Sequence, residues 1–436
     1  MSGLRLPSAV ILVAATLGLA ACGSTTSASP TGSTSSSTST TTTSSALPSA
    51  RGGRASLAAA STGALAIDLL QRLGGPTENT VFSPYSIQVA LSMVDTGAAR
   101  ETATQIGNVL RTPSATALAH ANAALNRRLA AATARSPQAP AAEVPQLNIA
   151  NALWLQTGLR LEPPFTSTLA ESFGAGPQLV DFHQQPQAAR QTINSWVSAR
   201  TDHIINDLMA AGTITPRTAL VLANAVYLKA HWSSPFISAD TAPGPFFTGA
   251  GSTVTVPFMT QPPTPFAYAT GPGYEAVDLP YGYSTLSMTI VMPDRGTMAQ
   301  FERTLTVGSL AALTRSLAPT RIDLRMPKFH LSSHADLVPT LAALGMPVAF
   351  GDMADFSGIT TEVPLAISAV QHGADLKVDE AGTVAAAATG IAVAPTAAAP
   401  GRVTQVTLDH PFLVFVRDDG TGTILFAARV SDPAGS

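Results

Sequence analysis

The chain has 436 residues, of which 45% are hydrophobic and only 12% are charged, about half the charged share of an ordinary soluble domain. Its 24 lysines and arginines against 27 aspartates and glutamates give a net charge of -3. This balance argues against nucleic acid as a partner, because phosphate binding depends on clustered cations. The single cysteine excludes an intrachain disulfide framework and a cysteine-rich zinc site.

Residues 1–21 are typical of an export signal, because Arg5 precedes an apolar run too short to span a bilayer comfortably. The Leu-Ala-Ala-Cys sequence at 19–22 resembles the bacterial lipobox, in which the cysteine becomes the lipidated first residue of the mature chain. We therefore expect an extracytoplasmic protein that Cys22 anchors to the cell membrane. The alternative is an ordinary secretory signal that happens to contain a cysteine, which would give a secreted protein.

Residues 22–50 are predicted to form a disordered tether, since positions 24–45 are almost entirely serine and threonine and show no apolar period. One ordered domain is expected over residues 51–436, because neither an internal repeat nor a break in composition divides it. A tether of this kind is consistent with a preceding membrane anchor.

In the ordered part, helices are predicted at 59–73, from Ser83-Pro84 to Gly97, and at 115–132, where apolar residues recur at helical spacing or alanine dominates. Helices dominate the first half and strands the second, which indicates an α+β fold rather than regular βαβ alternation. Strands are predicted at 146–155, 219–228, 254–259, 275–279, 286–292, 321–326, 403–408, 412–416 and 423–430.

The sequence holds no G-x-S-x-G elbow, H-E-x-x-H pair, Walker loop or dinucleotide-binding glycine pattern. His330 and His334 are four residues apart, but the residues between them predict a turn into a helix, and no further metal ligands are identifiable. We expect no metal, no cofactor and no enzymatic activity. A secreted hydrolase is only a formal alternative. The absence of a catalytic motif favours a function in binding other molecules or in inhibition.

The segment 379–400 is the most unusual part of the chain, since it is rich in alanine and carries no charge between Glu380 and Arg402. A linker or a surface helix is one interpretation, because alanine has the highest helix propensity. Strand-like sequence flanks the segment, however, and few residues follow it. A loop of small residues with free backbone N–H groups can also become a strand inside a packed sheet, and residues 383–388 meet both conditions.

From about residue 58 to 433 the sequence resembles the serpin family, through many short motifs that stand in the family order. These motifs are Asn79–Ile87 with Ala90–Met93, Gly97-Ala98, Thr102–Ile106, Ala150–Trp154, Ile193–Val197, Leu222–Lys229 with Trp232, Leu279–Tyr281, Met326–Phe329, Ala354–Ile359, His410–Phe412, and Ile424–Phe426 to Asp432-Pro433.

The resemblance implies helices around a large central mixed sheet, smaller sheets, and an exposed reactive centre loop at about 380–402. It also implies inhibition of a serine protease, or alternatively a cysteine protease. The protease attacks the loop, and the loop's hinge then inserts into the sheet while the enzyme is still acylated. The residues that match the inhibitory hinge are Glu380, Gly382, Thr383, Ala385, Ala386, Ala387, Ala388 and Thr389. A non-inhibitory binding lipoprotein of the same fold is the alternative.

The family's spacing from hinge to cleaved bond puts the P1 residue at Thr396 and the next residue at Ala397, with cleavage at Ala397 or Ala394 as alternatives. Small P1 residues suit elastase-like or subtilisin-like proteases. Trypsin-like targets are disfavoured, because their acidic S1 pocket selects arginine or lysine.

The same resemblance assigns two polar clusters. Ser83, Ser86, Asn224 and His372 match the shutter, a cluster beneath the sheet that controls its opening. Trp232, Lys328 and Glu380 match the breach, where the loop first enters, with Lys328 and Glu380 expected to form a buried pair. Only Arg127, Arg128 and Arg135 occur where some members bind glycosaminoglycans, so heparin activation is not predicted. We expect a monomer.

Overall fold

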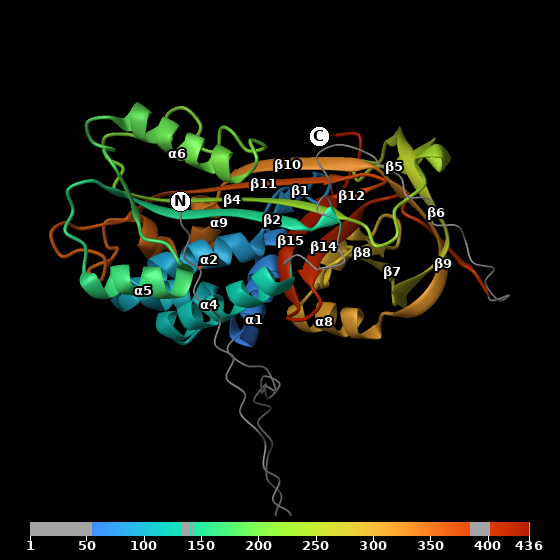
Figure 1. Cartoon of the computed structure of the whole chain (residues 1–436), viewed down its shortest axis with the longest axis horizontal. Coiled ribbons are helices and arrows are strands. Elements are labelled where there is room, and N and C mark those ends of the chain that lie inside the picture. The colour runs from blue at the N-terminus through green and yellow to red at the C-terminus, as the bar shows by residue number, and fades with distance from the viewer. Residues whose placement is uncertain (1–54, 133–139, 141–142, 384–401, 436) are drawn as a thin grey trace, which may run out of the picture. The chain divides into compact units, whose positions relative to one another are not determined.

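The computed structural model describes residues 55–132, 140, 143–383 and 402–435, and Figure 1 shows the order of their elements. The predicted helices at 59–73, 83–97 and 115–132 correspond to α1, α2 and α4. The α-helices in the described residues are α1 (Ala55–Leu70), α2 (Pro84–Asp95), α3 (Arg100–Val109), α4 (Ala115–Ala132), α5 (Pro163–Phe173), α6 (Pro186–Arg200), α7 (Met298–Thr304), α8 (Val307–Ser316) and α9 (Val338–Ala343), with short 3-10 helices at Ser238–Asp240 and Pro347–Phe350. None of these helices is both long and apolar enough to cross a bilayer.

The central sheet is mixed, as the sequence predicted. Its strands lie in the order β10 (Phe329–Asp336), β11 (Ile367–Val378), β4 (Leu220–His231), β2 (Gln146–Gln156) and β3 (Gln178–Val180), and the short β12 (Gly382–Thr383) pairs with the end of β4. The pairings β10–β11 and β4–β2 are antiparallel, whereas β11–β4 and β2–β3 are parallel.

A second sheet joins the other described strands into one continuous structure instead of separate smaller sheets. Its order is β1 (Thr80–Phe82), β15 (Thr423–Val430), β14 (Phe412–Asp418), β8 (Leu286–Pro293), β7 (Tyr274–Pro280), β6 (Thr253–Gly271), β9 (Ala318–Pro327) and β13 (Thr404–Thr407), with β5 (Ala242–Phe247) paired to β6. The 19-residue β6 is the connection, because it pairs with β5 at its start, with β9 along its middle and with β7 near its end.

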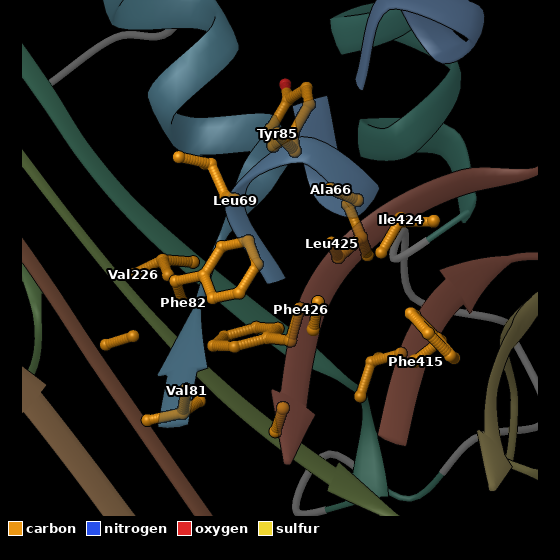
Figure 2. Close-up of a cluster of buried hydrophobic side chains, with 14 of the residues drawn as sticks. Ala66, Leu69, Val81, Phe82, Tyr85, Val226, Phe415, Ile424, Leu425 and Phe426 are labelled. Atoms are coloured by element: carbon orange, nitrogen blue, oxygen red, sulfur yellow. The ribbon is translucent and has the colours of Figure 1, made fainter. Parts of the chain in front are cut away.

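Apolar cores cover both faces of the central sheet at β2 and β4. On one face lies the main core, which includes α2; Figure 2 shows Phe82 and Phe426 close to Val226 of β4. The other face carries a second core, in which α6 packs on small residues of β2 and β4. The alanines of that face are Ala150, Ala152, Ala223 and Ala225, joined by Ala369 of β11.

One local prediction is wrong. The residues that follow His330 do not form a turn into a helix; they continue β10 as far as Asp336, paired with β11. Burial alternates along the start of this strand, with Phe329 and Leu331 buried and His330 exposed, and this period of two is the strand pattern. The pairing with β11 therefore outweighs the turn propensity of Ser332 and Ser333.

Candidate functional site

The site is organised around the seam, which we define as the parallel pairing of β4 residues Leu220–Tyr227 with β11 residues Ile367–Asp375. The two strands are direct neighbours over this length, so no other strand lies between them. Parallel ladders are slightly less stable per residue than antiparallel ones. The seam is therefore the place where the central sheet has the most to gain from an added strand that runs the other way.

The predicted shutter residues meet beneath the middle of the seam. Asn224 and His372 are direct register partners across it, and His372 Nδ1 is hydrogen-bonded to Asn224 Oδ1. From below, the backbone N–H of Ser83 donates to His372 Nε2 at 3.0 Å. The sequence resemblance named these residues, and the structure brings them into one hydrogen-bonded cluster.

Local structure explains why Ser83 and Ser86 reach this point. Ser83 is the N-cap of α2, with extended backbone and its side chain accepting from the Ser86 N–H at 3.1 Å, while Pro84 occupies the first helical turn. The Ser86 hydroxyl then donates to Asn151 Oδ1 of β2 at 2.6 Å. Asn151 pairs with Asn224 in register, so β2, β4 and β11 place Asn151, Asn224 and His372 in one row.

Because His372 Nε2 accepts from Ser83, its Nδ1 must carry the proton and donate to Asn224, which defines a neutral imidazole. Complete burial, together with a smaller electrostatic contribution from His334, lowers the pKa of His372 to about 3. A protonated ring would also place an N–H against the Ser83 N–H. The cluster thus requires an uncharged histidine.

The predicted breach residues meet at the end of β4. Trp232 donates from Nε1 to the carbonyl oxygen of Asp379 at 3.0 Å, and its backbone N–H donates to Ala381 at 2.9 Å. Its indole is stacked on the ring of Tyr281, with centroids 4.6 Å apart and planes 10° apart. Trp232 therefore holds the turn that carries Glu380.

Lys328 Nζ lies 2.8 Å from Glu380 Oε2, and the hydroxyl of Thr241 donates to the other carboxylate oxygen at 2.8 Å. Burial would raise the pKa of Glu380, but the hydrogen bonds from Lys328 and Thr241 and the Lys328 charge hold the pKa below its ordinary value. The expectation of a buried pair is wrong in part, because the Lys328 side chain is 35% exposed. The Lys328 ammonium group is therefore only partly removed from solvent.

The first hinge residues already pair with the sheet. Glu380 and Ala381 form a two-residue turn, closed by hydrogen bonds in both directions between Asp379 and Gly382. Gly382 then lies opposite His231 and Thr383 opposite Ala230, both antiparallel.

Position 382 requires glycine and position 383 is enclosed. Gly382 has φ of +150°, and a Cβ there would lie 2.1 Å from the carbonyl oxygen of Ala230. Thr383 is buried, and its hydroxyl is 2.6 Å from the hydroxyl of Tyr281.

A family model described as Serpin (serine protease inhibitor) matches residues 60–433. The chain belongs to the serpin family. Serpins are protease inhibitors rather than enzymes.

Similar serpins come from distant organisms. An uncharacterized serpin-like protein of Thermococcus kodakarensis is 34% identical over 367 residues, 84% of this chain and 83% of that protein. The leukocyte elastase inhibitor of Bos taurus is 34% identical over 390 residues, 86% of this chain and 99% of that protein. The crystal structure of the thermophilic serpin tengpin in its native state has a TM-score of 0.76 and 26% identity, covering 85% of this chain and 93% of tengpin.

Several predicted positions of this serpin lie outside the described residues: hinge residues Ala385, Ala386, Ala387, Ala388 and Thr389, the Thr396–Ala397 bond and its neighbour Ala394, and Cys22. No group of three or more histidine, cysteine, aspartate or glutamate side chains suited to a metal ion occurs among the described residues. His330 Nε2 of β10 is instead 2.8 Å from Asp375 Oδ2 of the adjacent strand β11.

Three further residues of the shutter and breach clusters were not predicted from the sequence: Asn151, Thr241 and Tyr281. Asn151 had one usable signal, since it is the only polar residue in the apolar part of β2 at 149–155 and stands between two alanines. Thr241 and Tyr281 contact residues more than 100 positions away, and nothing in their local sequence indicates it.

Proposed function

We propose that this serpin inhibits a serine protease by acting as a suicide substrate, with loop insertion along the seam between β4 and β11. The observation that carries the proposal is the turn at Asp379–Gly382. It sends the chain back toward β4 and leaves Gly382 and Thr383 paired with the end of that strand. Continuation of this pairing along β4 would lead the loop into the seam.

The driving force follows from strand directions. β11 and β4 are parallel to each other, so a strand that turns back after β11 is antiparallel to both. Its insertion would replace one parallel ladder with two antiparallel ladders, which are slightly more stable per residue and satisfy more backbone groups. The fold would release this free energy only after the loop is cut, because an intact loop is tethered at Arg402 and β13.

In the proposed reaction the protease serine attacks the carbonyl carbon of the P1 residue, the peptide bond breaks, and the new amino terminus leaves with a proton from the protease histidine. The protease then holds the hinge side of the loop as an ester. Insertion would carry the ester and the attached protease along the sheet. Distortion of the protease active site would prevent water from completing hydrolysis.

Thr396 is the proposed P1 residue, followed by Ala397, and an elastase-like or subtilisin-like protease is the proposed target. The name of the bovine relative, leukocyte elastase inhibitor, supports this preference, as does the small side chain at P1. We also propose that the chain is exported and anchored through Cys22, and that a Cys22→Ser variant would move from the membrane fraction to the soluble fraction.

The test is to mix the purified protein with elastase, subtilisin and trypsin and to separate the products in SDS. Trapping gives a complex that survives SDS with elastase or subtilisin, and mass spectrometry of the released C-terminal fragment identifies the P1 residue. Loop cleavage without any complex, and without a rise in melting temperature, would support the non-inhibitory alternative instead.

A hinge variant sharpens this test. Thr383→Arg places a charge at a buried position against Tyr281, so we expect cleavage with at least a tenfold loss of complex. Arg402→Ala is the matched control, since this residue is exposed on the far side of the loop. Equal complex formation by both variants would contradict insertion at Thr383.

A further inference from the structure

Helix α2 carries a row of buried polar side chains that the shutter does not use. Gln88, Ser92 and Asp95 are spaced by four and three residues, so they lie on one face of the helix. Their exposed fractions are 0%, 0% and 2%. The side-chain oxygen and nitrogen atoms of all three have no hydrogen-bond partner in the protein.

A fourth residue, Asn122 of α4, shares these properties, since it is fully buried and both atoms of its amide are unpartnered. Its helix meets α2 nearby, because the Tyr85 hydroxyl is hydrogen-bonded to Asn126 Oδ1. Asn122 is one turn before Asn126, so it lies on the α4 face that meets α2. Helix α1 packs against both α2 and α4.

These four residues account for seven of the ten unpartnered buried side-chain atoms in the described part of the chain. Two atoms come from Gln88, one from Ser92, two from Asp95 and two from Asn122. Buried polar groups are almost always hydrogen-bonded, either to protein or to ordered water. A concentration of unpartnered groups at one helix junction therefore points to a bound guest.

The donor and acceptor types identify the guest. The two amide NH₂ groups need acceptors, which a metal cation cannot supply, while the carboxylate and amide oxygens need donors. Water supplies both, and buried waters bind two to four such groups. We infer that the junction of α1, α2 and α4 encloses an internal hydration site, formed by Gln88, Ser92, Asp95 and Asn122, that holds a cluster of ordered water molecules.

Burial raises the pKa of the Asp95 carboxyl group to about 7, and its protonated form can both donate and accept a hydrogen bond. No neighbouring charge contributes to this shift. The titratable residues on the elements that pack against α2 are Asp68, Arg100, Glu101, His120, Arg127, Arg128, Tyr227, Lys229, His231 and Arg429. Among them Asp68 is paired with Arg111, Arg100 with Asp355 and Arg429 with Glu302.

The test is water-oxygen magnetic relaxation dispersion of the full-length protein, which detects waters that stay buried for longer than nanoseconds. The variant Gln88→Leu/Asn122→Leu removes both amides, and we expect it to lose the long-lived waters of this site. Thr116→Ala/His120→Ala is the matched control, because both residues are exposed on α4, and it should lose none. An unchanged dispersion amplitude in the leucine variant would overturn the inference.

A crystal structure of the unaltered protein provides a second measurement that does not depend on the variant folding. The inference requires solvent peaks within about 3 Å of side-chain atoms of these residues. Direct hydrogen bonds among the four side chains with no solvent, or a metal ion in their place, would refute it. Neither measurement depends on protease trapping, so failure of the proposed function would leave this result unaffected.

Discussion

Helix α2 buries polar side chains along its whole length, but its first turn and its remainder satisfy them differently. At its start, the side chain of the N-cap residue Ser83 accepts from the Ser86 N–H, and the Ser86 hydroxyl donates to Asn151 of β2. Gln88, Ser92 and Asp95 reach no protein partner. Strands supply polar groups at fixed register, whereas packed helices supply side chains whose positions must adapt. This difference fits our inference that water supplies the partners of Gln88, Ser92 and Asp95.

The two regions also respond to protons in opposite ways. Burial lowers the pKa of His372 to about 3 and raises that of Asp95 to about 7, because each group is more stable uncharged. The free energy of unfolding that His372 contributes falls as the pH falls below about 6.5, since the unfolded chain then binds the proton first. The contribution of Asp95 falls as the pH rises from about 4 to 7, since the unfolded chain then releases its proton first.

The largest expected effect is at His372. We expect His372→Ala to lower the free energy of unfolding at pH 7 by about 3–5 kcal/mol, because Ser83 N–H and Asn224 Oδ1 lose their partner and a cavity forms. Denaturant-induced unfolding followed by fluorescence measures this change. His334→Ala, at an exposed position of β10, should change it by less than about 0.5 kcal/mol. An equal loss of unfolding free energy in both variants would contradict the role of His372 as the hydrogen-bonding partner of Ser83 and Asn224.

The next effect is at Asp95 and has the opposite sign. Asp95→Asn should raise the free energy of unfolding by about 2–4 kcal/mol at pH 8, where the unaltered protein must hold a buried charge. Below about pH 3 the carboxyl is protonated in both states, so the variant should gain almost nothing. Thermal unfolding across this pH range measures the difference. A gain independent of pH would contradict the raised pKa, and exposed Asp352→Asn serves as the control.

The smallest effect separates two serines of the same helix. Ser86→Ala should cost about 1–2 kcal/mol, because buried Asn151 Oδ1 loses the donor at 2.6 Å. Ser92→Ala should change stability by less than about 0.5 kcal/mol, because its hydroxyl has no protein partner to lose. Both serines are fully buried, so burial alone cannot explain a difference. Similar losses from the two variants would show that Ser92 has a partner after all.

Elements with strong local patterns were predictable from the sequence. The apolar spacing after Ser83-Pro84 defines α2, and the apolar strings at 219–228 and 412–416 are the cores of β4 and β14. The course of β10 after His330 was missed, because Ser332 and Ser333 favour a turn when β11 is not considered. Long-range pairing decided the structure there.

The site was predictable only through the family resemblance. Ser83, Asn224 and His372 are far apart in sequence, and no local pattern indicates that they meet. The polar spacing of Gln88, Ser92 and Asp95 was visible in an otherwise apolar helix, but the absence of partners required the packed neighbours. A sequence pattern gives the face of a helix, and the tertiary fold decides what that face contacts.

The three tryptophans of the chain have a practical consequence for time-resolved work. Trp232 is stacked on Tyr281 where β4 ends, whereas Trp154 of β2 and Trp196 of α6 form an edge-to-face pair, with ring centroids 5.7 Å apart. Indole fluorescence depends on ring stacking and local polarity, so the protein contains intrinsic fluorescent probes at two separate sites, Trp232 and the Trp154–Trp196 pair. If Trp232 or the Trp154–Trp196 pair is replaced by phenylalanine, only one site remains fluorescent. Stopped-flow fluorescence of each variant would then measure when the proposed loop insertion changes the surroundings of that site.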